Sequence, residues 1–179
     1  MKTNDKVGRF FRDVKEKVKG KQKADFDKIY ESGNFPLLKH FLEEHNLIHF
    51  MRDGKGNTVL HLMAGHQIPK NLVPLINEGL NVNAINDQGE SPLHLASKTR
   101  CLSNVKLLVR EDCKLETKDH IGNTALHMAA AHGRINIVNY LIKAGLNIQD
   151  KNKNGETPLD LAIKYEHYEL AAEYSPKTA

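Results

Sequence analysis

Three histidines at one fixed interval are the first residues of this chain that could carry chemistry. His61, His94 and His127 are separated by 33 residues and then by 33 again. Histidine is a common general base and a common metal ligand, so an active site or a metal site is the first interpretation to weigh. None of the motifs GxSxG, HExxH or GxGxxG, which mark common catalytic, zinc-binding and nucleotide-binding sites, occurs in the sequence.

A second pair of histidines, His66 and His132, follows the first and the third of these by five residues. Five residues advance a helix by about 500°, so the two members do not share a face as a zinc-binding i, i+4 pair must. We therefore expect His66 and His132 to face solvent at the end of a helix. Cys101 and Cys113 lack zinc-ligand spacing and are too few for a disulfide scaffold. No metal and no cofactor is predicted.

The same interval relates many other positions, which makes the repeat the organising feature of the chain. Four registers start at Asp53, Asn86, Asp119 and Asn152. Glycine, a hydroxyl side chain and leucine recur in each register, at 56, 89, 122 and 155, at 58, 91, 124 and 157, and at 60, 93, 126 and 159. Coincidences at one fixed period of this length indicate a repeat array.

Local chemistry predicts the same pair of helices in every register. The Asp/Asn-x-x-Gly stretch favours a turn, and the hydroxyl residue after it can cap a helix by accepting from an unpaired backbone N–H, at Thr58, Ser91, Thr124 and Thr157. The second helix has apolar residues at three- and four-residue intervals, as in Ile135, Val138, Leu141 and Ile142. Gly79 and Gly145 stand where the end of that helix favours a left-handed residue.

The first helices of the four registers begin with a shared motif. They read TVLHLMA, SPLHLAS, TALHMAA and TPLDLAI. With the turn before each motif and the second helix after it, the sequence resembles the ankyrin-repeat family over residues 53–174. It departs from the family pattern at Val59, which replaces proline, and at Asp160, which replaces the histidine. The resemblance implies an all-α repeat solenoid in which helix-turn-helix units are joined by β-hairpin-like loops.

The resemblance also predicts how the chain is divided. It assigns three full repeats, a C-terminal capping repeat that ends in its second helix, and a short tail, at 53–85, 86–118, 119–151, 152–174 and 175–179. Residues 25–52 are expected to form a degenerate N-terminal repeat, because they keep two helical stretches around the Gly33-Asn34 turn but lack the TPLH motif. Residues 1–24 form a separate segment before the repeats.

The resemblance changes the interpretation of the three spaced histidines. Equivalent positions of neighbouring repeats are separated by about 10 Å, too far to share one metal ion with bonds of about 2 Å. The resemblance implies instead that His61, His94 and His127 are buried and bond the Ser/Thr-containing turns and the backbone of the neighbouring repeat. We therefore expect a structural role for these imidazoles and for the four capping hydroxyl residues. The repeats leave too few residues for a catalytic domain, so an enzyme is not expected.

The N-terminal segment 1–24 is basic and amphipathic. It holds nine Lys/Arg and three Asp/Glu, whereas the remaining residues hold 17 and 19, so the positive charge of the chain resides in this segment. Its apolar residues share one helical stripe, made of Val7, Phe10, Phe11, Val14 and Val18. The stripe is consistent with a cap on the first repeat, with a solvated disordered tail, or with binding to a membrane surface or a partner groove. The nearly neutral body argues against a nucleic-acid-binding face.

Family resemblance assigns partner binding to a concave surface made of the hairpin tips and the ends of the first helices. Ile85 and Ile121 stand out because an apolar side chain on an exposed tip has no core to fill, although each could instead pack on the neighbouring hairpin. The full set of predicted partner-binding residues is His66, Ile85, Gln88, Lys98, Thr99, Arg100, His120, Ile121, His132, Lys153 and Tyr165.

The family resemblance therefore implies a non-enzymatic protein–protein interaction module that binds an unidentified partner protein. The alternative from another class is a peripheral membrane or polyanion adaptor that uses residues 1–24. Within the family, an unregulated inhibitor similar to those of Rel-type transcription factors and a pathogen effector both remain open. A monomer in an intracellular, cytoplasmic setting is expected, with the nucleus or a host cell as other locations, because no secretory signal and no membrane span is recognised.

Overall fold

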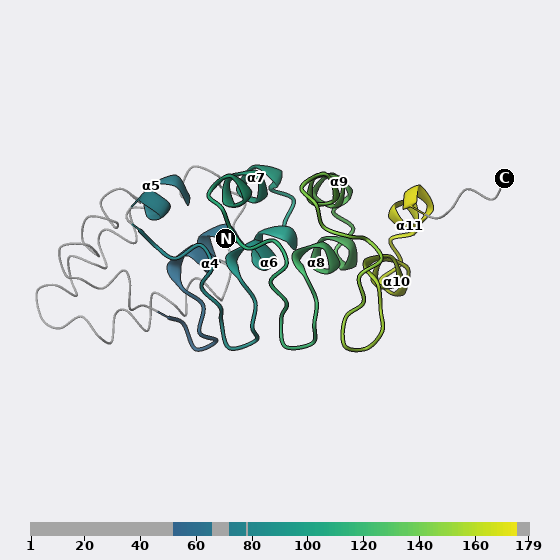
Figure 1. The fold of residues 1–179 in the computed structure, drawn as a ribbon, viewed down its shortest axis with the longest axis horizontal. Helices are drawn as coiled ribbons and strands as arrows, with labels where there is room; N and C mark the ends of the chain where they lie inside the picture. The colour runs from purple at the N-terminus through teal and green to yellow at the C-terminus, as the bar shows by residue number, and fades with distance from the viewer. Residues whose placement is uncertain (1–51, 66–71, 78, 175–179) are drawn as a thin grey trace, which may run out of the picture.

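Helix pairs stacked side by side form the described part of the protein. The structure is a computed structural model, and it describes residues 52–65, 72–77 and 79–174. Figure 1 shows the first helix of each register in a lower row, the second helices in an upper row, and the hairpin loops projecting below both. These residues contain no β-strand, and Arg52 and Thr58 form one isolated bridge. The all-α repeat solenoid predicted from the sequence is confirmed.

Each register contributes two helices to the stack. The first helices are α4 (Val59–Ala64), α6 (Pro92–Ser97), α8 (Ala125–Ala131) and α10 (Pro158–Lys164). The second helices are α5 (Leu72–Asn77), α7 (Leu102–Arg110), α9 (Ile135–Lys143) and α11 (Tyr168–Tyr174). Consecutive first helices pack against each other, and each also packs on the second helix of its own register. A register therefore buries its apolar residues only when neighbours are present, as in other solenoids.

The core is a layer of leucines shared by successive first helices. Leu60, Leu93 and Leu126 are at most 1% exposed. Removing one such side chain from water contributes about 1.5–3 kcal/mol to folding. Ala96 and Ala129 are also fully buried, and their small side chains let neighbouring first helices approach closely. The leucine that recurs at the period is thus the residue that joins the registers.

The apolar residues of α9 pack against the core, as their three- and four-residue spacing predicted. In α9, Val138 and Leu141 are fully buried, but Ile135 and Ile142 are only partly buried. Ile137, which the predicted stripe omitted, is 2% exposed. The predicted apolar spacing holds, since Ile135 and Ile142 pack against the core, and Ile137 is buried as well because α9 packs both on α8 of its own register and on α7 of the preceding one.

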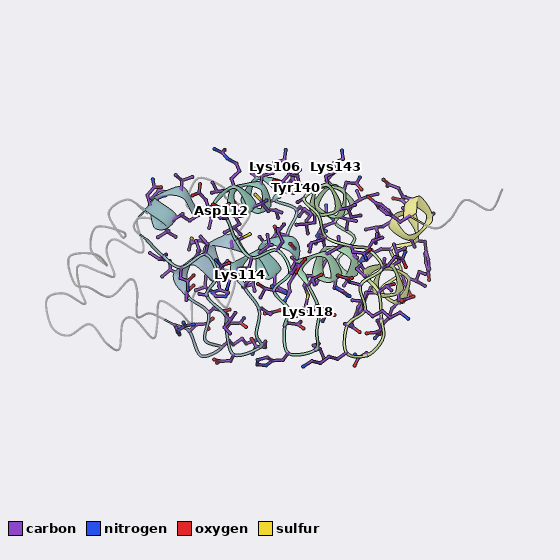
Figure 2. The ribbon with its side chains drawn as sticks, in the orientation of Figure 1. Lys106, Asp112, Lys114, Lys118, Tyr140 and Lys143 are labelled. Carbon is purple, nitrogen blue, oxygen red and sulfur yellow. The ribbon has the colours of Figure 1, made fainter. Side chains whose placement is uncertain are left out.

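A cation–π contact links successive second helices in the upper row. Nζ of Lys106 in α7 lies 5.8 Å from the centroid of the Tyr140 ring in α9, and Figure 2 shows the two side chains next to each other. Lys143 extends from the same row of helices, away from the hairpin loops below (Figure 2).

The residue at the end of α5, α7 and α9 that precedes the next loop adopts the left-handed conformation. Gly79 has φ of +80° and Gly145 has φ of +113°, which confirms the prediction for these two glycines. The equivalent position after α7 is Asp112, with φ of +52°, and it is labelled in Figure 2. Aspartate tolerates this region better than most side chains, so the helix ends in the same way without a glycine.

Each hairpin loop is tied to the next by a backbone hydrogen bond near its tip. The donor N–H and the acceptor carbonyl belong to Asp87 and Lys55 (3.0 Å), to His120 and Gln88 (2.9 Å), and to Lys153 and Ile121 (2.9 Å). These bonds recur at the period of the repeat. Each bond gives a backbone N–H a partner within the protein, where a free loop would leave it to water. Each bond also holds two neighbouring tips at a fixed spacing.

Several predictions fall outside the described residues. They concern the segment 1–24, all of the degenerate repeat 25–52 except Arg52, the side chain of His66, and the tail 175–179. None of the described helices is long and apolar enough to cross a membrane.

Candidate protein-interaction surface

The three spaced histidines lie inside the stack and bridge neighbouring registers. His61, His94 and His127 are each at most 1% exposed. Their Nε2 atoms pair with a backbone carbonyl of the next register, at Glu90 (2.9 Å), Asn123 (3.0 Å) and Glu156 (3.3 Å). Among the described residues no group of three or more His, Cys, Asp or Glu side chains could hold a metal ion. The imidazoles therefore connect repeats rather than meeting at one centre.

The hydrogen bonds determine which ring nitrogen of each histidine carries the hydrogen. The backbone N–H of Thr58 donates to Nδ1 of His61 at 3.2 Å. A backbone N–H can only donate, so Nδ1 is unprotonated and the neutral ring carries its hydrogen on Nε2. Ser91 and Thr124 donate to Nδ1 of the next two histidines in the same way. Burial lowers the pKa of all three imidazoles below the ordinary value, although the backbone bond at Nε2 raises it in part.

The capping hydroxyl groups have two partners. Thr58 accepts from the backbone N–H of His61 at 3.4 Å, as the capping pattern predicted, and the resemblance had also implied a bond between the histidines and the Ser/Thr-containing turns. The shorter contact joins the hydroxyl to Nδ1 of the histidine, at 2.8 Å for Thr58, 2.8 Å for Ser91 and 2.9 Å for Thr124. Because Nδ1 is the acceptor, the hydroxyl donates to it. The Ser/Thr and the histidine therefore act as one unit at the start of each first helix.

Asp160 reproduces half of this arrangement in the last register. Its Oδ2 accepts from the backbone N–H of Thr157 at 2.8 Å and from the hydroxyl of Thr157 at 2.7 Å. A carboxylate has no counterpart of the Nε2–H that reaches the following repeat. The residue that replaces histidine thus caps its own helix and makes no bridge onward.

Buried amides at the bases of the hairpins form a second set of bridges. Nδ2 of Asn86 donates to Oδ1 of Asn57 at 2.8 Å, and Nδ2 of Asn152 donates to Oδ1 of Asn123 at 2.9 Å. All four asparagines are at most 8% exposed. Sequence reasoning treated the first residue of each register only as a turn former and missed these bonds.

Two ion pairs occur in the second and fourth registers, the same two registers that begin with Asn86 and Asn152. Glu90 pairs with Lys98, and Glu156 pairs with Lys164 at 2.6 Å. Burial raises the pKa of Glu90, but hydrogen bonds from Lys98 and Asn86 outweigh it and lower that pKa. The hydrogen bond from Lys164, followed by that from Asn152, lowers the pKa of Glu156 to about 2. The sequence could have predicted these ion pairs, because the second and fourth registers share Glu and Lys at these positions and the first and third do not.

The predicted hairpin-tip residues divide into two kinds. Ile85 and Ile121 are 53% and 52% exposed. His120 and Lys153, two other predicted tip residues, each lie against the preceding hairpin. A Cβ added at Gly89 would be 2.7 Å from Cδ2 of His120, and Nζ of Lys153 donates to the carbonyl of His120 at 2.8 Å. Gln88 is exposed, and its carbonyl takes part in the tip-to-tip bonds. The isoleucines are therefore exposed apolar side chains at the tips.

The predicted residues at the ends of the first helices also differ in availability. The hydroxyl of Thr99 donates to the carbonyl of Ala96 at 2.7 Å and accepts from the N–H of Cys101 at 3.1 Å. Lys98 is held in its ion pair. His132 and Arg100 are exposed, and Tyr165 is 53% exposed.

A depression of about 400 Å³ brings three of the predicted residues together. It lies between the third and fourth registers, and Ile121, His132 and Tyr165 are among its lining residues. Residues that the sequence did not single out complete the lining, namely Asn123, Met128, Ala131, Asn152, Asn154, Glu156, Leu161 and Lys164. The predicted residues of the second register, Ile85, Gln88 and Lys98–Arg100, are not part of this lining.

The repeat geometry agrees with what comparison with known families shows. A family model described as "Ankyrin repeats (3 copies)" matches residues 28–119 and 113–173. The chain belongs to the ankyrin-repeat family. Ankyrin repeats are in general protein–protein interaction modules, and the family is typically non-enzymatic. A search of curated proteins returned no match.

Proposed function

We propose that this ankyrin-repeat chain is a non-enzymatic interaction module that binds a partner protein through its hairpin tips and first-helix ends. The observation that carries the proposal is the exposure of Ile121 and Tyr165 around one depression. Both side chains are more than half exposed, and both line the space between the third and fourth registers. Apolar side chains at such positions gain most by being covered on binding.

The bonding inside the stack supports a binding role over a catalytic one. The imidazoles of His61, His94 and His127 have both ring nitrogens occupied by hydrogen bonds within the chain. A general base needs a ring nitrogen within reach of a substrate proton. These three side chains are buried and engaged, so they hold the surface in place and leave recognition to the exposed residues.

An affinity experiment tests the proposal while the partner is still unidentified. Proteins recovered by the wild-type chain are compared with those recovered by a variant carrying Ile85→Glu, Ile121→Glu and Tyr165→Glu. We expect the variant to lose the partner, because each substitution places a charge where an apolar contact is proposed. The matched control carries Val73→Glu and Tyr168→Glu, which are 44% and 62% exposed and lie on the second helices α5 and α11.

The control is expected to recover the partner as the wild type does. Circular dichroism on all three proteins establishes that each is folded. Equal recovery by the wild type and by the Ile85/Ile121/Tyr165 variant would contradict the proposed surface.

The charge of residues 1–24 supports a second candidate function, binding to an anionic surface. These residues hold nine Lys/Arg against three Asp/Glu, and such segments are attracted to anionic lipid headgroups at low ionic strength. Binding of the full chain and of a chain lacking residues 1–24 to phosphatidylserine vesicles tests it. Salt-sensitive binding that requires the segment would support this function, and absence of binding at low salt would exclude it.

A further inference from the structure

The depression between the last two registers has an apolar base. Leu161 of α10 is 6% exposed, and Met128 and Ala131 of α8 are partly buried beside it. Ile121 and Tyr165 add two exposed apolar side chains to the same lining. A bulky apolar side chain inserted here would cover apolar surface on both registers at once.

Positive side chains gather around His132 at the edge of this depression. Nε of Arg134 donates to the carbonyl of Lys98 at 3.0 Å, and the ring of His167 lies against Gly133, where an added Cβ would be 2.6 Å from its Nδ1. Burial lowers the pKa of His132, and the neighbouring charges of Lys98, Arg134 and His167 lower it further. These groups come from the second, third and fourth registers, so the stack itself assembles the cluster.

The acidic groups nearby are largely engaged by donors of this chain, whereas some of the cations are not. Glu156 is held by Lys164, and Asp160 accepts from Thr157. In the part of the chain that the structure describes, Arg100 and Arg134 form no ion pair. At the described helix ends around His132, the charges outside these ion pairs are those of Arg100, Arg134 and the exposed Glu166, so the charge left to attract a ligand there is positive.

The ring of His132 has a fixed orientation at this edge. Its Nδ1 pairs with the carbonyl of Met128 at 2.9 Å, so Nδ1 carries the hydrogen. Because the pKa of this imidazole is lowered, the ring is neutral near pH 7 and Nε2 is an acceptor, so the positive charge at this edge comes from the arginines.

From this combination we propose that the depression binds an acidic peptide segment of a partner protein that carries a bulky apolar side chain. The apolar side chain enters between α8 and α10, and the acidic side chains lie over Arg134 and Arg100. The inference rests on the proposed function above and names the chemistry of the partner at that surface. A peptide with aspartate or glutamate beside Phe or Leu matches both the apolar depression and its positively charged edge. A basic peptide and an uncharged peptide both fail to match the charged edge.

Fluorescence anisotropy with defined peptides tests this assignment on the full chain. The probe is a short labelled peptide in which glutamates flank a Phe-Leu pair. One matched peptide replaces the glutamates by lysines, and the other replaces Phe-Leu by Ser-Ser. We expect the first peptide to bind at least about tenfold more tightly than either matched peptide, and its binding to weaken as salt screens the charges.

Three substitutions localise the binding. Arg100→Glu and Tyr165→Ser should each weaken binding of the acidic peptide, by about tenfold for the charge reversal. Glu166→Gln removes an exposed negative charge between Tyr165 and His167 and should strengthen it. The matched control is Lys143→Glu, the same charge reversal on the exposed face of α9 (Figure 2), and it should leave binding unchanged.

The outcomes separate this inference from the proposed function. Equal or tighter binding of the lysine peptide would overturn it, and so would equal binding of the Ser-Ser peptide. An equal loss in the Lys143→Glu control would show a general charge effect and overturn the localisation. In each case the affinity experiment with the Ile85/Ile121/Tyr165 variant still decides whether the surface binds a protein at all.

Discussion

At the scale of single residues, the buried histidines act as two-ended connectors. One nitrogen of His94 accepts from the N–H of Ser91 at 3.1 Å, and the other donates to the carbonyl of Asn123 at 3.0 Å in the next register. Because only a neutral ring with its hydrogen on Nε2 can make both bonds, the residue couples a helix cap to an interface between repeats. The same unit recurs at His61 and His127, so it is a property of the repeat.

The first prediction removes one connector. His94→Ala is expected to lower the free energy of unfolding by about 1–3 kcal/mol, because the N–H of Ser91 and the carbonyl of Asn123 lose a buried partner. Urea denaturation followed by circular dichroism measures the change. His120→Ala is the control, since this exposed histidine should change stability by no more than about 0.5 kcal/mol. A loss no larger in His94→Ala than in the control would contradict the connector role.

The second prediction concerns pH. In the folded chain, burial lowers the pKa of His61, His94 and His127 below the ordinary value of 6.5. Their contribution to stability is therefore complete above pH 6.5 and is lost as pH falls below it. Each histidine can cost at most about 1.4 kcal/mol per pH unit in that range. The carboxylates Glu90 and Glu156 have lowered pKa values too, so their contribution is lost only below about 4.5.

Urea midpoints measured between about pH 7.5 and about pH 5.5 test this dependence. Stability should fall across the range, and it should fall less steeply in His94→Ala, which has one buried imidazole fewer. A stability that is constant or rises on acidification would show that the buried rings are not held neutral.

At the scale of elements, the hairpins alternate in chemistry from one register to the next. Asn86 uses Oδ1 to accept from the N–H groups of Gln88 and Glu90, at 2.9 Å each, and uses Nδ2 to reach Asn57. Asp119 occupies the equivalent position and accepts from Asn123 within its own hairpin. Registers that begin with asparagine therefore alternate with registers that begin with aspartate. The Nδ2 groups of Asn86 and Asn152 donate to the preceding hairpin, where Asn57 and Asn123 offer an Oδ1 acceptor.

The third prediction exchanges one atom in this alternation. Asn86→Asp keeps the shape and the two turn bonds but turns the Nδ2 donor into an oxygen that faces Oδ1 of Asn57. We expect a loss of about 1–3 kcal/mol in unfolding free energy, typical of a buried group left without its partner. Asn81→Asp serves as the control, because Asn81 accepts from Asn83 at an exposed turn and donates to no buried group there. Urea titrations that give equal stabilities for the two variants would remove the role assigned to Asn86.

The period and local chemistry of the sequence were sufficient to predict the helices and the left-handed ends at Gly79 and Gly145, and the family resemblance added the buried histidines, because all of these depend on features that recur from register to register. It was insufficient for the depression lined by Met128, Leu161 and Lys164, since that lining depends on how two particular helix ends face each other in space. The spacing example did not include Ile137, which is buried because α9 has two neighbours, α8 and α7.

At the scale of the whole molecule, the stack has interior positions and an end. Ala64, Ser97 and Ala130 occupy one position in successive registers, and all three are fully buried because the next first helix covers them. Ile163 occupies the same position in the last register and is 51% exposed. A large apolar residue is tolerated there because no described helix packs over it.

The fourth prediction compares this position inside the stack and at its end. Ile163→Glu should change the unfolding free energy by no more than about 0.5 kcal/mol. Ala130→Glu places a larger, charged side chain in a fully buried site and should cost about 3 kcal/mol or more. Thermal and urea unfolding of the two variants measures both. A similar cost for both variants would show that the end of the stack is covered.

The central claim is that the chain binds a partner protein over its hairpin tips and first-helix ends, and site-specific photocrosslinking tests it most directly. A photoreactive amino acid is placed at Tyr165, beside the depression, and in a second protein at Lys143 on α9. Both proteins are irradiated with the partner recovered by affinity. We predict that the partner is crosslinked from position 165 and not from position 143. Crosslinking from position 143 alone, or equally from both positions, would contradict the account.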